Sequence, residues 1–180
     1  MVRDILLWPD PGLAKRAAPV EAVEASVQSL IRDLFDTMYA APGVGLAAPQ
    51  VGVLLQVMVL DTRARQPDSR PFAMVNPRIL ERLGTTTYRE GCLSIPGEAE
   101  DVERAERVTV EYLDEHGEPQ RLACEGLLAI AVQHETDHLQ GTVYLDHLSP
   151  LTRVLIRKRM RARKRERAVV EQTVQLGDQL

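Results

Sequence analysis

The sequence has few cysteines. Only Cys92 and Cys124 occur among its 180 residues. Secreted domains that depend on disulfides carry many more cysteines for their length. The sequence therefore excludes a disulfide scaffold, and we expect both cysteines to be thiols in a reducing compartment. A free cysteine of this kind is commonly a small buried hydrophobic residue, unless it binds a metal or reacts.

Long apolar runs are also missing. The run from residue 5 to 8 ends at Pro9 and is too short for a signal peptide, and Asp4 argues against a transit peptide. The run from residue 127 to 132 stops at Gln133 and is far shorter than a membrane span. We therefore predict a cytoplasmic protein that does not engage a membrane.

The sequence contains no internal repeat and no linker, so its length predicts one domain. Apolar steps of three and four predict helices over residues 20–39 and 125–140, and a third after residue 150 that frays from residue 172. Strands are predicted at 53–60, 72–80 and 85–88, with a hairpin over 108–124. We predict an α+β fold in which mostly antiparallel strands surround a central helix, with one helix toward each terminus. Residues 1–150 would form the catalytic part, and residues 151–180 a basic helix and tail of the same domain.

The net charge of −4 conceals an uneven distribution of charge. Residues 153–167 contain nine Lys/Arg and one acid, a local charge of +8, whereas the rest of the chain carries −12. A basic segment on an acidic body indicates a polyanionic partner, although a solvated, charge-rich helix would look the same.

The segment V-Q-H-E-T-D-H-L-Q-G places His134, Glu135 and His138 on the second predicted helix. Both histidines fall on the same apolar stripe as Leu127 and Ile130, so both rings point into the protein. Two buried imidazoles without partners are costly, and a divalent cation removes that cost. Glu135 would then lie beside the metal and accept a proton from a bound water.

A catalytic metal site needs a third protein ligand. Cys92, which we predict to lie in the tight glycine-bounded loop R-E-G-C-L-S-I-P-G, is the stronger candidate, because a thiolate suits iron or zinc. It could equally be a structural thiol. His147 could ligate if the chain folds back, His116 reads as a solvated residue of a hairpin turn, and Cys124 reads as core.

The segment G-V-G-L-A-A-P-Q-V-G, from residue 43 to 52, has glycines that permit close backbone approach. It reads either as a loop that ends the first helix or as a ligand-facing loop. In the second interpretation, the Gln50 amide donates to a developing negative charge.

Together these three segments resemble one family. G-x-G-L-A-A-P-Q at 43–50, E-G-C-L-S at 90–94 and Q-H-E-x-D-H at 133–138 match the order and approximate spacing of the peptide deformylase motifs. The resemblance extends from about residue 5 past residue 151, and the helical tail is similar to the form common in Gram-negative bacteria.

The resemblance implies an amide hydrolase that removes the formyl group from the N-terminal formyl-methionine of newly made polypeptides. Cys92, His134 and His138 would bind one Fe²⁺, which Zn²⁺, Ni²⁺ or Co²⁺ can replace. Metal-bound hydroxide would attack the formyl carbon, and Glu135 would move the proton from the water to the departing amine. The Gln50 amide and the Leu93 backbone N–H would hold the oxyanion.

The resemblance also assigns substrate contacts and partners. Glu90 and Arg104 would form a structural ion pair, and the basic tail would dock on the ribosome, with no role in binding DNA. The peptide backbone and the methionine side chain would be bound by Val44, Gly45, Tyr88, Gly91, Leu127, Ile130 and Ala131.

One segment departs from the family pattern. Residues 97–101 read G-E-A-E-D, where some relatives carry a basic residue near the bound peptide. The acidic segment predicts weaker binding of substrates with acidic residues after the methionine.

Two other functions fit parts of the sequence. A zincin-type metalloprotease would take its third ligand downstream, from His147 or an acid, and would not need Cys92. A ribosome-binding protein without catalysis would use only the basic tail, but intact metal ligands, Glu135 and Gln50 argue against it.

Overall fold

The computed structural model describes residues 1–177, and the side chains of residues 1–163. The chain divides into two compact units, Met1–His147 and a second that begins at Leu148. All of the strands that the structure describes lie in the first unit. In the described residues, no helix is both long and apolar enough to cross a membrane.

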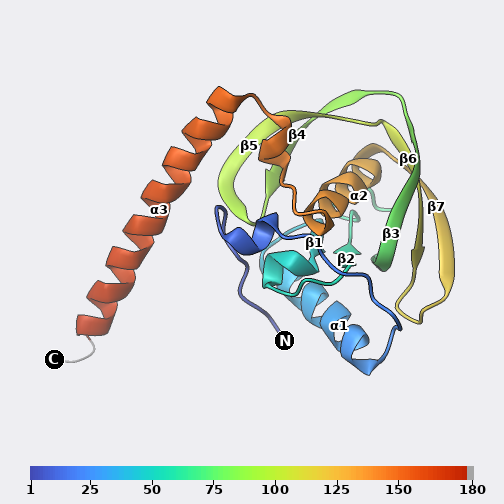
Figure 1. Ribbon diagram of the computed structural model, residues 1–180, viewed down its shortest axis with the longest axis horizontal. Helices are drawn as coiled ribbons and strands as arrows, with labels where there is room; N and C mark the ends of the chain where they lie inside the picture. The colour runs from blue at the N-terminus through green and yellow to red at the C-terminus, as the bar shows by residue number, and fades with distance from the viewer. Residues whose placement is uncertain (178–180) are drawn as a thin grey trace. The chain divides into compact units, whose positions relative to one another are not determined.

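The larger of the two sheets in the described residues has five strands, in the order β1-β2-β3-β6-β7 (Figure 1). The strands are β1 (Gly45–Ala47), β2 (Val57–Leu60), β3 (Phe72–Leu83), β6 (Arg107–Leu113) and β7 (Pro119–Glu125). Every pairing in this sheet is antiparallel. A separate antiparallel hairpin joins β4 (Thr86–Cys92) to β5 (Ile95–Arg104).

Helix α2 (Gly126–Leu139) lies among these strands, and its apolar side packs into a core with β2, β3, β6 and β7 (Figure 1). Helix α1 (Ala25–Ala40) packs against a second core, built on the other side chains of β1, β2 and β3. Strands β2 and β3 thus contribute to both cores. Because α2 is enclosed, the side chains on its inner stripe, which include His134 and His138, are buried. The predicted α+β class, with antiparallel strands around a central helix, is confirmed.

Helix α1 begins five residues later than predicted. The Asn76 side chain bonds to both backbone groups of Val20: its amide donates to the carbonyl oxygen at 2.8 Å and its oxygen accepts from the N–H at 2.8 Å. These bonds hold Val20 in an extended segment, so the apolar spacing that includes Val20 and Val23 is not helical.

Two strand boundaries differ from the predicted ones for similar reasons. Residues 53–56 do not extend β2, because their backbone bonds to Ala18 in the N-terminal segment. Strand β3 continues past Pro77, where a break was predicted, because the pairing of β3 with β6 shifts register between Val75 and Arg78. Such a bulge accommodates a proline, which has no N–H to donate.

Strand β5 was not predicted, since its sequence is rich in proline, glycine and acidic residues.

Helix α3 (Pro150–Gly177) begins as predicted. It stays helical through residues 172–177, for which fraying was predicted, and residues 178–180 lie outside the described residues. Residues 1–177 also contain three short 3₁₀ helices: Pro11–Ala14, Ala48–Val51 and Tyr144–His147, the last labelled η3.

Candidate active site and metal centre

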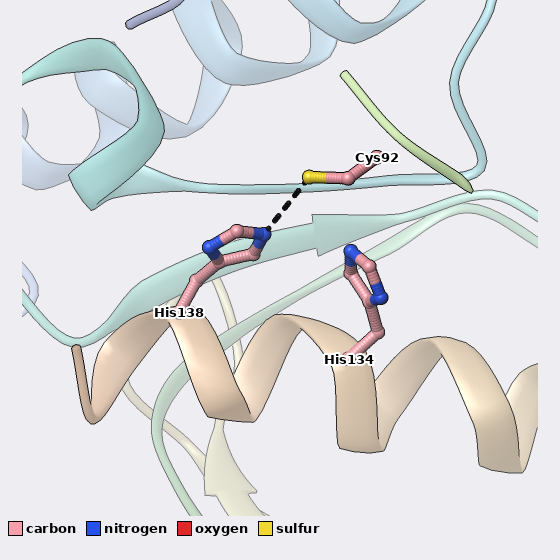
Figure 2. Close-up of side chains that lie close together, drawn as sticks. All are labelled: Cys92, His134 and His138. Carbon is pink, nitrogen blue, oxygen red and sulfur yellow. Dashed lines mark hydrogen bonds between the residues drawn. The ribbon is translucent and has the colours of Figure 1, made fainter. Parts of the chain in front are cut away.

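Cys92, His134 and His138 converge in the interior of the first unit. Figure 2 shows both imidazoles rising from α2 toward the Cys92 sulfur. The Cys92 Sγ lies 3.3 Å from His138 Nε2, and one ligand atom from each of the three residues lies within 4.8 Å of the other two. His134 and His138 are buried, and Cys92 is half-buried. In the described residues this is the group of three whose donor atoms approach closely enough to share one ion.

Cys92 ends β4 and therefore lies at a strand end, whereas the sequence suggested a loop. The turn between the two strands is formed by Leu93 and Ser94. The β4–β5 pairing jumps from Gly91–Ala99 to Cys92–Ile95, so residues 96–98 of β5 form a bulge. Gly97 in that bulge has φ of 74°, a conformation that favours glycine. The irregularity turns the end of β4 toward α2, and so aims the thiol at the two histidines.

Glu90 fixes the orientation of the His134 ring. Its Oε2 lies 2.7 Å from His134 Nδ1 in a buried environment. Burial opposes the charge of Glu90, but the hydrogen bonds from His134 and Arg104 outweigh it and hold the pKa of this carboxyl below its usual value. An ionised carboxylate only accepts, so Nδ1 carries the proton and Nε2 presents its lone pair to the site.

The environment of His134 favours a positive charge at this point. Burial disfavours a charged ring, but hydrogen bonds to Cys92 and Glu90 raise the pKa of His134 well above its usual value. For His138, burial and the nearby charges of His134 and Arg104 lower the pKa well below its usual value, so that this ring is neutral. A metal ion would meet one thiol and two imidazole lone pairs, and its charge would replace the proton that the site otherwise attracts.

The donor set fits a divalent transition metal. One sulfur and two imidazole nitrogens are the ligands that suit iron or zinc, and three protein ligands leave a coordination position open. The Nδ1 atom of His138 is buried with no hydrogen-bond partner, so no competing contact holds this ring away from the site.

Glu135 follows His134 in the sequence, and no ion pair that the structure describes neutralises its carboxylate. Its Oε2 is buried without a partner, and burial raises the pKa of its carboxyl to about 7. A Cβ atom at position 45 would lie 2.5 Å from Glu135 Oε1, so Gly45 provides the space that the carboxylate fills. A carboxyl group with a pKa near neutrality, and a free oxygen, can take up and release a proton during a reaction.

The Gln50 amide is locked with its nitrogen toward the site. Its Oε1 accepts from the Ala47 N–H at 2.9 Å, and its Nε2 lies 3.2 Å from Ser94 Oγ and 3.6 Å from Cys92 Sγ. The N-terminal segment holds the two segments that carry Gln50 and Ser94. The Leu6 N–H donates to the Gln50 carbonyl and the Trp8 N–H to the Ser94 carbonyl, each at 2.8 Å.

A cleft of about 520 Å³ opens onto these groups. Gln50, Leu93 and Glu135 line it, together with all of the residues assigned to the peptide backbone and the methionine side chain: Val44, Gly45, Tyr88, Gly91, Leu127, Ile130 and Ala131.

The cleft also has lining residues that the sequence did not reveal. Arg65 donates to the Tyr88 hydroxyl at 2.7 Å, and Arg89 and Glu98 lie on the same walls. Arg65 comes from a polar connection without periodicity, so no pattern placed it at the site. The cleft wall therefore carries both signs of charge, and weaker binding of acidic substrates stays a prediction.

Glu90 and Arg104 lie together as the resemblance implied. Arg104 donates through Nε to Glu90 Oε1 at 2.7 Å and through Nη2 to Oε2 at 3.0 Å. The sequence did not reveal that Arg104 Nη1 also donates to Asp137 Oδ2, at 2.6 Å. His147 contacts Asp137 as well, and it does not belong to the group of three ligands.

The remaining candidates lie away from the site. His116 is exposed in the turn between β6 and β7, and Cys124 is buried on β7, where burial raises the pKa of its thiol to about 12. Taken together, a Cys-His-His ligand set with two buried histidines and an adjacent unpartnered carboxylate are the arrangement of a metal-dependent hydrolase.

Comparisons with known proteins agree on one family. The polypeptide deformylase family model matches residues 2–154. The chain is 48% identical over 178 residues to a peptide deformylase of Alkalilimnicola ehrlichii, covering 99% of this chain and 97% of that protein. It is 49% identical over 159 residues to peptide deformylase 2 of Xanthomonas campestris pv. campestris, covering 87% and 92%. The crystal structure of a peptide deformylase from Legionella pneumophila superposes with a TM-score of 0.87 at 47% identity, covering 93% and 98%.

The chain therefore belongs to the polypeptide deformylase family, whose members are metal-dependent hydrolases that remove the formyl group from new polypeptides. The family that the three motifs indicated is confirmed.

Proposed function

We propose that this chain removes the formyl group from the N-terminal formyl-methionine of nascent polypeptides in the cytoplasm, with Fe²⁺ bound by Cys92, His134 and His138. The observation that carries the proposal is the convergence of these three donors beside the unpartnered carboxylate of Glu135. The ion supplies a Lewis acid, which lowers the pKa of water and polarises the formyl carbonyl. Zn²⁺, Ni²⁺ or Co²⁺ would fit the same donors.

Glu135 acts as the general base and then as the general acid. Its Oε2 takes a proton from the attacking water and returns it to the amine nitrogen as the C–N bond breaks. A pKa of about 7 suits both tasks, because the carboxyl group is a fair acceptor and a fair donor near neutral pH.

The oxyanion that develops on the formyl oxygen needs donors that are already in position. The Gln50 Nε2 is such a donor, because Oε1 is held by the Ala47 N–H and the amide cannot turn over without losing that bond. The Leu93 N–H is the second donor in this proposal. Gly45 and Gly91 would align the substrate backbone, while Val44, Tyr88, Leu127, Ile130 and Ala131 would surround the methionine side chain.

The activity is tested directly with formyl-Met-Ala and anaerobically prepared Fe²⁺ enzyme. We expect release of one formate per peptide, and no release from metal-free protein, because no group of the chain alone activates water strongly enough to attack an amide. The control is acetyl-Met-Ala, whose acyl group is larger by one methyl. Absence of formate from the Fe²⁺ enzyme would contradict the proposed function and favour the non-catalytic ribosome-binding alternative.

We also propose that α3 docks on ribosomal RNA. Residues 153–167 carry a local charge of +8 within this helix, which suits an array of phosphates. If about four phosphates are contacted, the affinity for ribosomes should fall about 100-fold between 50 and 200 mM salt. Sedimentation with ribosomes at graded salt measures this, with R157Q/K158Q/R159Q/R161Q as the test variant and R78Q/R82Q, on β3, as the control. Salt-independent binding, or equal binding by both variants, would contradict docking.

A further inference from the structure

A continuous chain of hydrogen bonds runs from the surface to a metal ligand. His147, whose side chain is 37% exposed, lies 2.7 Å from Asp137 through its Nε2. Asp137 Oδ2 also accepts from Arg104 Nη1 at 2.6 Å. Arg104 then binds both oxygens of Glu90, and Glu90 accepts from His134 Nδ1 at 2.7 Å.

We propose that His147 is a positioning residue for the metal centre and acts through this chain on His134. The proposal uses the ligand set and deepens the proposed function, but it does not depend on which substrate is cleaved. It also gives a role to the one remaining histidine that neither ligates nor lies in an exposed turn.

The charges in the chain show why His147 is needed. Glu90 and Asp137 are two carboxylates that share the single guanidinium of Arg104, whose side chain is 5% exposed. Arg104 alone leaves the Asp137 oxygen with one donor. His147 Nε2 lies between the two groups, 2.7 Å from Asp137 Oδ2 and 3.3 Å from Arg104 Nη1. The carboxylate can only accept, so the shorter contact assigns the proton to Nε2, which provides the second donor to Asp137. Without it, Asp137, which is 23% exposed, can turn toward solvent and release one end of the guanidinium.

The guanidinium transmits this change, because its donors point in fixed directions. Nε and Nη2 face Glu90 and Nη1 faces Asp137, so the plane of the group is held from both ends. A guanidinium held at only one end lets Glu90 move, and Glu90 sets both the tautomer and the direction of the His134 ring. His147 cannot act on the other ligand, His138, through a similar chain of hydrogen bonds, because His138 Nδ1 has no hydrogen-bond partner.

The 3₁₀ helix η3 reinforces the same ligand from a second direction. Tyr144, at its start, stacks on the His134 ring with centroids 6.1 Å apart and planes at 24°, while His147 ends it. One short element thus contacts His134 directly, through Tyr144, and indirectly, through the side chains of Asp137, Arg104 and Glu90. Fixing η3 against α2 therefore fixes the ring that must meet the metal.

The test measures how fast the protein loses metal. Co²⁺-loaded protein is mixed with excess EDTA, and the decay of the visible Co²⁺ bands gives the release rate. Loss of an outer partner of a ligand typically costs 10- to 100-fold in metal affinity. The outer partner of His134 is Glu90, and His147 acts on Glu90 only through Asp137 and Arg104. The effect should therefore be smaller, and we expect H147A to release Co²⁺ about 3- to 10-fold faster, with altered band positions.

Two further variants make the result specific. H147Q places an amide N–H where Nε2 lies, so it should restore the wild-type release rate and bands. H116A removes a histidine that is 72% exposed in a turn and should leave both unchanged. Wild-type release from H147A, or equal defects in H147A and H147Q, would overturn the proposal, whatever happens to the melting temperature. Failure to deformylate any peptide would instead contradict the proposed function and leave this measurement intact.

Discussion

Replacing Cys92 with alanine is expected to remove the metal and the activity together. The variant keeps only the two imidazoles of α2, which leave the ion with two protein ligands instead of three. The affinity should fall by more than the roughly 10- to 100-fold that loss of an outer-shell partner costs. Metal content after gel filtration, measured by atomic emission, should fall from about one ion per chain to a small fraction of that, and formyl-Met-Ala should not be cleaved.

Cys124→Ala is the matched control for this experiment. Cys124 is also a thiol, but it is buried in the core on β7, and burial raises its pKa to about 12, so it does not form a thiolate at neutral pH. C124A should keep its metal and its activity. If C92A retained a full complement of metal, the third ligand would lie elsewhere, as a zincin-type protease requires, and our assignment would be wrong.

Glu135→Gln is expected to separate metal binding from catalysis. Glutamine has nearly the same shape, so it fits the space beside Gly45, but it cannot accept and return a proton. Loss of general acid–base catalysis should lower kcat by roughly 10²- to 10⁴-fold while the metal content stays at that of the wild type. A value of kcat within tenfold of the wild type would exclude Glu135 as the proton carrier.

The same variant should be more stable than the wild type when both are free of metal. Burial raises the pKa of Glu135 from 4.5 to about 7, so the folded protein binds this proton more tightly than the unfolded chain does. The stability of the wild type therefore falls as pH rises from about 4.5 to 7, by up to ~3 kcal/mol. Urea denaturation at pH 8 should favour E135Q, and the difference should shrink toward pH 4. A difference that does not change with pH would mean that Glu135 is not destabilised by burial.

The sequence indicated which side chains come together at the candidate metal centre better than it indicated what surrounds them. His134 and His138 were found because helical spacing is local, and four residues suffice to place two side chains on one stripe. Cys92 and His147 were both possible third ligands, because the choice depends on where β4 ends and how η3 turns, and neither is encoded in spacing. The family resemblance chose Cys92, and the structure places its sulfur 3.3 Å from His138 Nε2.

Contacts between distant segments were the ones that the sequence could not supply. Asn76 determines where α1 begins, although it lies 56 residues from Val20. Strand β5 has no alternation of apolar and polar residues that would mark it in the sequence. It forms because its backbone pairs with β4, for example Ala99 with Gly91 and Glu100 with Glu90. Arg104 was paired with Glu90 from the resemblance, but its third donor and Asp137 became visible only once β5 and α2 were placed side by side.

The contact between Gly45 and Glu135 makes two distant positions depend on each other. A methyl group at position 45 would need the volume that the carboxylate now occupies, 2.5 Å away. Substitution at Gly45, in the first motif, is therefore limited by Glu135, in the third motif. An alanine at position 45 fits only if the Glu135 carboxylate moves away. A larger residue at position 45 would therefore displace the carboxylate on which the proposed proton transfer depends.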